Sequence, residues 1–155
     1  MAYIYFNNYE ANSTAIYCIC ETESDIENFT ITNSLEQVEI SNDDFLKLKR
    51  GTHQINTRNG TTFTWTNMKN NTEGAPIDFY QDSDALQRDL THISSVLDTW
   101  LTQNESNARH SDVQSYKNFV DNFDVNSLTF PNSKTWGEIC EDNSQTYFSF
   151  SELPR

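Results

Sequence analysis

Residues 38–66, VEISNDDFLKLKRGTHQINTRNGTTFTWT, contain the signals that decide the fold. Val38 and Ile40 alternate with a polar residue, which is the period of a half-buried β-strand. Ser41 follows as a candidate N-cap for a short helix, because its hydroxyl can accept a hydrogen bond from a backbone N–H in the first turn. Gly51 can take the left-handed conformation that ends such a helix. The stretch therefore predicts a strand, a short helix and then a reversal of the chain.

The remainder of this stretch, residues 53–66, predicts a β-hairpin. It is rich in threonine and in branched or aromatic residues, which favour strands. Asn59-Gly60 is the pair most favoured in a two-residue type I′ turn. Phe63 and Trp65 share one face of the returning strand, and threonines occupy the other face.

Helical periodicity dominates the second half of the chain. Apolar residues recur in steps of three and four through residues 84–103, which predicts an amphipathic helix that begins at a Ser83 cap. A second apolar stripe follows Ser111, which matches the first position of a capping box. The short connection should pack the two helices against each other. A third, short helix is expected after Asn132 or Ser133.

The β-prone segments lie mainly before residue 38. They are residues 3–6, 15–20 and 29–32, and a last aromatic run covers residues 147–150. We predict an α+β fold in three parts. These are a small N-terminal antiparallel β domain with one short helix at residues 1–66, a linker at 67–82, and a mostly α domain at 83–155, built from a helical hairpin with a third short helix.

Charge and hydropathy limit the class of partner. The chain has 23 acidic and 10 basic residues and a net charge of −13, which argues against binding nucleic acid or an anionic membrane. No segment reaches the roughly 20 apolar residues of a membrane helix, and the N-terminus lacks a signal-peptide pattern. We therefore expect a soluble protein of a cytoplasm whose partners are proteins.

Motifs for catalysis or metal binding are missing from the sequence. Cys18 and Cys20 have only the distant Cys140 as a further thiol, which is not the ligand spacing of a zinc site, so we expect them to pack in the core. The three histidines fall in three different predicted elements. Isolated glycines exclude a P-loop or a dinucleotide-binding fingerprint. We expect no enzyme, no metal and no cofactor.

Aromatic residues are the candidates for a partner-binding site. Tyr3 and Tyr5 share one face of the first strand, and Phe63 and Trp65 share one face of the hairpin. They could form part of the core, as aromatic residues of small domains usually do. They could also form a protein-binding face beside an exposed strand edge, to which a partner adds a strand by β-augmentation.

The segment around the hairpin resembles the tail fibre assembly proteins of tailed bacteriophages. The residues that carry the resemblance, about a fifth of the chain, are Val38-Glu39-Ile40-Ser41, Asp43-Asp44-Phe45, Leu48, Gly51, Ile55 and Asn59-Gly60. The chain differs from that family in having only Pro76 where a proline-rich stretch is usual, and an acidic, aromatic second half instead of a basic, alanine-rich one.

The resemblance implies a non-enzymatic chaperone. Such a protein binds the tip of a trimeric fibre in the host-cell cytoplasm, covers unpaired strand edges until the trimer closes, and sometimes stays in the virion tail. A permanent virion structural protein that bridges tail components would share these features.

An alternative function is an acidic inhibitor of a mobile element, which mimics DNA and blocks a nucleic-acid-binding enzyme. Its best local candidates are Glu21, Glu23, Asp25 and Glu27, which would line one face of a strand. A solvated loop is the other interpretation of this segment, because Asp and Glu disfavour strands. Binding by a mimic should weaken steeply with salt, whereas edge pairing should not.

Overall fold

The computed structural model describes residues 1–154 and confirms the α+β fold. The chain forms two compact units, which we call the β unit (residues 1–68 and 148–154) and the helical unit (residues 69–147). The sequence predicts a linker at residues 67–82 and a mostly α domain at 83–155, whereas in the structure the second unit begins at Lys69 and residues 148–154 belong to the β unit. None of the helices within residues 1–154 combines the length and apolar composition that a membrane-spanning segment needs.

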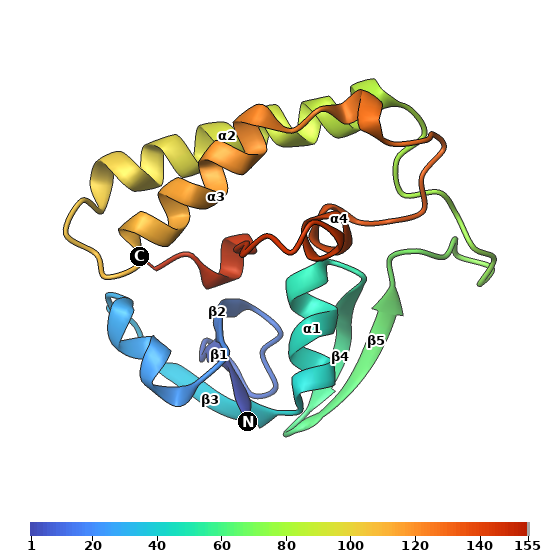
Figure 1. Ribbon diagram of the computed structural model, residues 1–155. Helices are drawn as coiled ribbons and strands as arrows, with labels where there is room; N and C mark the ends of the chain where they lie inside the picture. Colours follow the sequence, from blue (N-terminus) through green and yellow to red (C-terminus); the bar gives the residue numbers. More distant parts are fainter. Residues whose placement is uncertain (155) are drawn as a thin grey trace. The chain divides into compact units, whose positions relative to one another are not determined.

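The β unit contains a three-stranded sheet and a separate hairpin (Figure 1). Its elements are β1 (Ala2–Asn7), β2 (Ile16–Cys20), the 3₁₀ helix η1 (Glu23–Asn28), β3 (Leu35–Ile40), α1 (Asn42–Arg50), β4 (His53–Asn59), β5 (Thr62–Asn67) and the 3₁₀ helix η3 (Phe150–Glu152). The sheet has the strand order β2-β1-β3 and is antiparallel throughout, while among residues 1–154 the strands β4 and β5 pair only with each other.

Alternation along β1 gives the sheet two buried faces. Ile4 and Phe6 lie on one face, in a cluster that includes Phe45 of α1. Tyr5 lies on the other face, in a cluster with Tyr17 and both cysteines of β2. Both faces are covered because the strand alternates between two sets of large apolar side chains, each of which must leave water.

A β-bulge in β2 places one side chain on the opposite face of the sheet from the one predicted. The sequence placed Ile16 on the same face as Cys18 and Cys20, but the register passes from Tyr5 opposite Cys18 to Phe6 opposite Ile16. Tyr17 is therefore the extra residue, and Ile16 joins the cluster on the opposite face. A bulge shifts the alternation by one residue, which period counting cannot detect.

The helix α1 forms as predicted. The Ser41 hydroxyl accepts a hydrogen bond from the Asp44 N–H (3.1 Å), and Gly51 ends the helix with a φ of +74°. The following turn is shifted by one residue from the prediction, because Asn59 pairs with Thr62 and leaves Gly60 and Thr61 as the loop. Gly60 has a φ of +61°, so glycine stands at the first central position, as in a type II′ turn.

The helical unit contains α2 (Ser83–Gln103), α3 (His110–Asn122), the 3₁₀ helix η2 (Val125–Ser127) and α4 (Trp136–Asp142). The predicted hairpin is confirmed: α2 and α3 lie side by side (Figure 1). The predicted caps are wrong. Asp82 caps α2, no side chain caps α3, and Thr135 caps α4 through a capping box.

An aromatic cluster joins α3 to α4. The Trp136 ring packs against Phe119 and Phe123, with centroid distances of 5.7 and 5.1 Å. Its indole Nε1–H donates to the Tyr116 hydroxyl at 3.0 Å. Trp136 is only 7% exposed, so the buried N–H has the partner that a buried polar group requires.

Three further segments differ from their predicted form. Residues 29–32 contain no strand, and residues 147–150 lead into η3 instead of forming one. In the predicted linker, the Ile77 N–H donates to the Lys69 carbonyl (2.9 Å), and Tyr80 pairs with Asn132. Lys69 also forms an ion pair with Glu138 (2.8 Å), so this segment is held within the helical unit.

Candidate functional site

The four aromatic residues singled out in the sequence do not form one surface. Tyr3 and Tyr5 lie on β1, on the face of the sheet that also carries Tyr17. Phe63 of β5 packs against the cluster on the opposite face, with its ring centre 6.0 Å from that of Phe6. The sheet therefore lies between Tyr5 and Phe63, and the two pairs do not form one continuous aromatic face.

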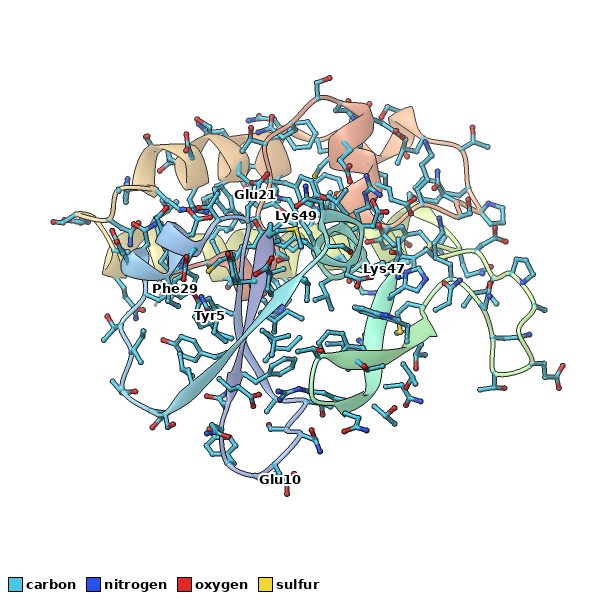
Figure 2. The ribbon with its side chains drawn as sticks, turned by 90° about the horizontal axis from the view of Figure 1, so that it is seen from below. Tyr5, Glu10, Glu21, Phe29, Lys47 and Lys49 are labelled. Atoms are coloured by element: carbon cyan, nitrogen blue, oxygen red, sulfur yellow. The ribbon has the colours of Figure 1, made fainter. Side chains whose placement is uncertain are left out.

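Tyr5 is a core residue with a satisfied hydroxyl. It is 6% exposed and belongs to the same buried cluster as Phe29 (Figure 2). Its hydroxyl accepts a hydrogen bond from Nε2 of Gln37 at 2.8 Å. Burial raises the pKa of Tyr5, although the Gln37 hydrogen bond acts in the opposite direction. Tyr3, one step along the strand, is half-buried.

Trp65 is half-buried on the hairpin and is held by its neighbours. The Lys47 ammonium, on α1 (Figure 2), lies 4.7 Å from the centre of the indole, a cation–π distance. The rings of His53 and Phe63 meet Trp65 edge-on, at centroid distances of 6.4 and 5.9 Å. Trp65 therefore contacts a cation and two rings and leaves part of its indole exposed on the hairpin.

The strand β3 has an open edge. The Asn7 N–H donates to the Ala15 carbonyl on the β2 side (2.8 Å), and the Asn8 N–H donates to the Ser34 carbonyl on the β3 side (3.1 Å). In an antiparallel pair, successive residues point their backbone N–H and C=O groups alternately toward and away from the neighbouring strand. The backbone groups of Ile4 therefore point toward its partner in β3, and those of every second residue of β3 point outward, away from β1. The outward backbone groups are those of Leu35, Gln37 and Glu39. No backbone group within residues 1–154 bonds to them.

The strand β5 has a second open edge. The Met68 N–H donates to the Thr52 carbonyl (2.8 Å), back toward the β4 side of the hairpin. By the same alternation, the N–H and C=O groups of Phe63 and Trp65 point away from β4. The β3 edge carries glutamates and the β5 edge carries no charged residue.

The cysteines and histidines do not assemble a reactive centre in the described chain. Cys18, Cys20 and Cys140 are all buried, as expected for core residues. The Nδ1 atom of His53 lies 2.9 Å from the hydroxyl of Thr52, while the other histidines lie on α2 and α3. Within residues 1–154, no group of three or more His, Cys, Asp or Glu side chains could hold a metal ion.

Arg58 is a buried residue that the sequence did not single out. Its side chain is 1% exposed, and its guanidinium lies over the Phe6 ring at 4.2 Å. Nε donates to the Gly60 carbonyl and Nη1 to the Ser13 carbonyl, both at 2.8 Å. Nη2 lies 2.5 Å from the Glu36 carboxylate, and this hydrogen bond lowers the pKa of Glu36. One side chain thus joins the hairpin, the β1–β2 loop and β3.

Glu152 forms a second buried ion pair in the β unit. Its carboxylate lies 3.0 Å from Nζ of Lys49, which is on α1 (Figure 2), and also accepts from the Ser149 hydroxyl at 3.1 Å. Burial raises the pKa of Glu152, and the Lys49 and Ser149 interactions oppose that rise without cancelling it. The carboxyl group therefore binds its proton more tightly in the folded chain than in the unfolded chain.

This raised pKa predicts a pH dependence of stability. Because the folded chain binds more protons than the unfolded chain, the contribution of Glu152 should fall as pH rises from the ordinary glutamate pKa through the raised one. Glu152→Gln should remove this part of the pH dependence, as measured by urea unfolding across the acidic and neutral range. Glu105→Gln, at an exposed position, should keep the wild-type profile. Matching profiles for wild type and Glu152→Gln would contradict the prediction.

Known proteins offer no direct guide to these edges. Comparison with protein-family models, curated protein sequences and solved structures found no match to this chain.

Proposed function

We propose that this chain is a non-enzymatic phage protein that binds a tail fibre or another tail protein and assists its assembly. It would act as a chaperone in the host-cell cytoplasm or remain as a virion structural protein. The observation that carries the proposal is the open edge of β3, whose outward backbone groups have no backbone partner within residues 1–154.

An extended partner segment can add to β3 as a fourth strand. It would bond to the outward N–H and C=O groups of Leu35, Gln37 and Glu39, which supply affinity without requiring a particular sequence. The side chains of Leu35, Gln37 and Glu39 share one face of the sheet with Tyr3 and Tyr5, which lie on the neighbouring strand β1. Alternate side chains of the added strand would lie next to those of β3 on this face. The resemblance to tail fibre assembly proteins implies that the partner would be a fibre subunit whose strand edges are unpaired until the trimer closes.

Charge supports selective pairing at this edge. Glu36 and Glu39 both lie on β3, and the whole chain has a net charge of −13. Charged edge strands resist pairing with copies of themselves, because like charges placed opposite one another are destabilising. A neutral or basic partner strand does not meet this repulsion.

Proline at Glu39 tests this edge directly. Glu39→Pro removes an outward N–H, a position where edge strands tolerate proline, while Glu39→Gln removes only the charge. In pull-downs from phage-infected cells, we expect wild type and Glu39→Gln to retain a fibre or tail protein in high salt. Glu39→Pro should lose it by about tenfold, or 1.4 kcal/mol. An unchanged melting temperature would exclude misfolding as the cause, and equal capture by all three chains would contradict edge pairing.

The same pull-down also tests the alternative function, an acidic inhibitor that mimics DNA. Glu21, Glu23 and Glu27 are exposed, but residues 23–28 form the 3₁₀ helix η1 and do not line a strand face. Asp25 accepts a hydrogen bond from the Thr22 N–H (2.9 Å), which holds it at the helix start. Capture of a nuclease or polymerase that salt releases would overturn the assembly proposal and favour the acidic inhibitor.

A further inference from the structure

One stretch of this acidic chain contains no acid. Residues 45–72 include five of the ten Lys and Arg residues and none of the 23 Asp and Glu residues. Carboxylates just outside or far from this stretch pair with Lys47, Lys49, Arg58 and Lys69, at N···O distances of 2.9, 3.0, 2.5 and 2.8 Å. The strand β5 therefore lies in a stretch of sequence that has no carboxylate of its own to repel a second copy.

The edge of β5 lacks the usual protection against pairing. Residues 62–67, TFTWTN, contain no charge and no proline, and the bulge of the hairpin lies in β4. Natural edge strands are normally blunted by such features. The contrast with β3, which carries Glu36 and Glu39, indicates that the two open edges have different partners.

The sequence of β5 is complementary to itself. Thr62-Phe63-Thr64-Trp65-Thr66 has the same pattern in both directions about Thr64. We propose that β5 pairs antiparallel with β5 of a second copy of the chain, about a twofold axis at Thr64. This pairing joins two hairpins into one four-stranded sheet.

The geometry of β5 suits this register. Phe63 faces Trp65 of the second copy, and these are the residues whose backbone groups point outward, so the facing pair can exchange both hydrogen bonds. The same pairs place aromatic rings opposite each other on one face, and threonines face threonines on the other. Aromatic pairs and threonine pairs that face each other across two strands stabilise such pairing. Because a twofold contact uses the same edge of both copies, no β5 edge is left for a third copy and assembly stops at the dimer.

A second copy fits this edge because it supplies the matching pattern of aromatic and threonine residues in the reverse direction. The net charge of −13 on each copy opposes association at long range. Salt screens that repulsion, so the dimer should strengthen as ionic strength rises. The wild-type chain should move from 18.0 kDa toward twice that mass as its concentration increases in sedimentation equilibrium.

A charge-swap pair tests the register. Thr62 and Thr66 are exposed, and in the dimer each faces the other residue of the second copy. Thr62→Lys/Thr66→Lys places like charges opposite each other and should weaken the dimer by about tenfold. Thr62→Lys/Thr66→Glu places opposite charges there and should restore the affinity to within about threefold of wild type. Within one chain the two positions are about 13 Å apart, too far to interact strongly.

Three results would overturn the proposal. A wild-type chain that stays at 18.0 kDa up to about 1 mM does not form this dimer. Equal weakening by both double variants would show that Thr62 does not face Thr66. A wild-type dimer that weakens as salt rises would require attraction between charges, which this edge lacks. Circular dichroism and melting temperature serve as folding controls for each variant.

Discussion

Replacing Arg58 with methionine is expected to lower the free energy of unfolding by about 3 kcal/mol. The variant keeps much of the side-chain volume but removes the donors that serve the carbonyls of Ser13 and Gly60. It also leaves Glu36 without its cation. Because the Glu36 side chain is 42% exposed, its carboxylate can return to water, which places the effect at the lower end of the range for broken buried pairs. Urea unfolding measures the change.

Two variants separate the guanidinium from a general loss of positive charge. Arg88→Met, at an exposed position of α2, should change stability by no more than about 0.5 kcal/mol. Arg58→Lys keeps the charge but cannot reach Ser13, Gly60 and Glu36 at once, so it should also be destabilised. Equal stability of Arg58→Met and Arg88→Met would show that the buried hydrogen bonds contribute nothing net.

Trp136→Ala should lower the free energy of unfolding by about 4 kcal/mol. The substitution removes a 7%-exposed indole from the cluster with Phe119 and Phe123 and leaves a cavity between α3 and α4. It also removes the donor to the buried Tyr116 hydroxyl. Because the effect arises in the helical unit, helical ellipticity during urea unfolding is the appropriate signal.

Trp136→Phe divides this effect into packing and hydrogen bonding. It keeps an aromatic ring in the cluster and removes the indole N–H, so it should be destabilised by about 1–2 kcal/mol. Ile31→Ala, at a residue that is 52% exposed, should remain within about 0.5 kcal/mol of wild type. A Trp136→Ala variant no less stable than Ile31→Ala would contradict the cluster as a source of stability.

Signals between near neighbours in the sequence predicted much of this fold. The Ser41 cap and the Gly51 stop of α1 each depend on contacts within one helical turn, and both were correct. The start of α2 was wrong by one residue because Asp82 and Ser83 are both good capping residues. Which of two adjacent residues caps a helix depends on the direction from which the chain enters, and this is not a local property.

The burial of Arg58 could not be predicted from the sequence, for a different reason. Simple alternation from Ile55 would place Arg58 on the exposed face of β4, where a cation is unremarkable. The bulge at Asn56 shifts the alternation, so Arg58 shares the inner face with Phe63. Its partner Ser13 is 45 residues away in the sequence, and no local pattern links the two. The separation of Tyr5 from Phe63 likewise depends on packing between the sheet and the hairpin.

The β unit is not continuous in the sequence, and this affects its synthesis. Residues 1–68 emerge first, but residues 148–154, which bring η3 beside β2, follow only after the whole helical unit. At the usual translation rate, about 80 residues take roughly 4–16 s, during which the nascent β unit lacks its last segment. Lys49 also lacks Glu152 throughout this interval. The β unit is therefore completed only after the helical unit has been synthesised.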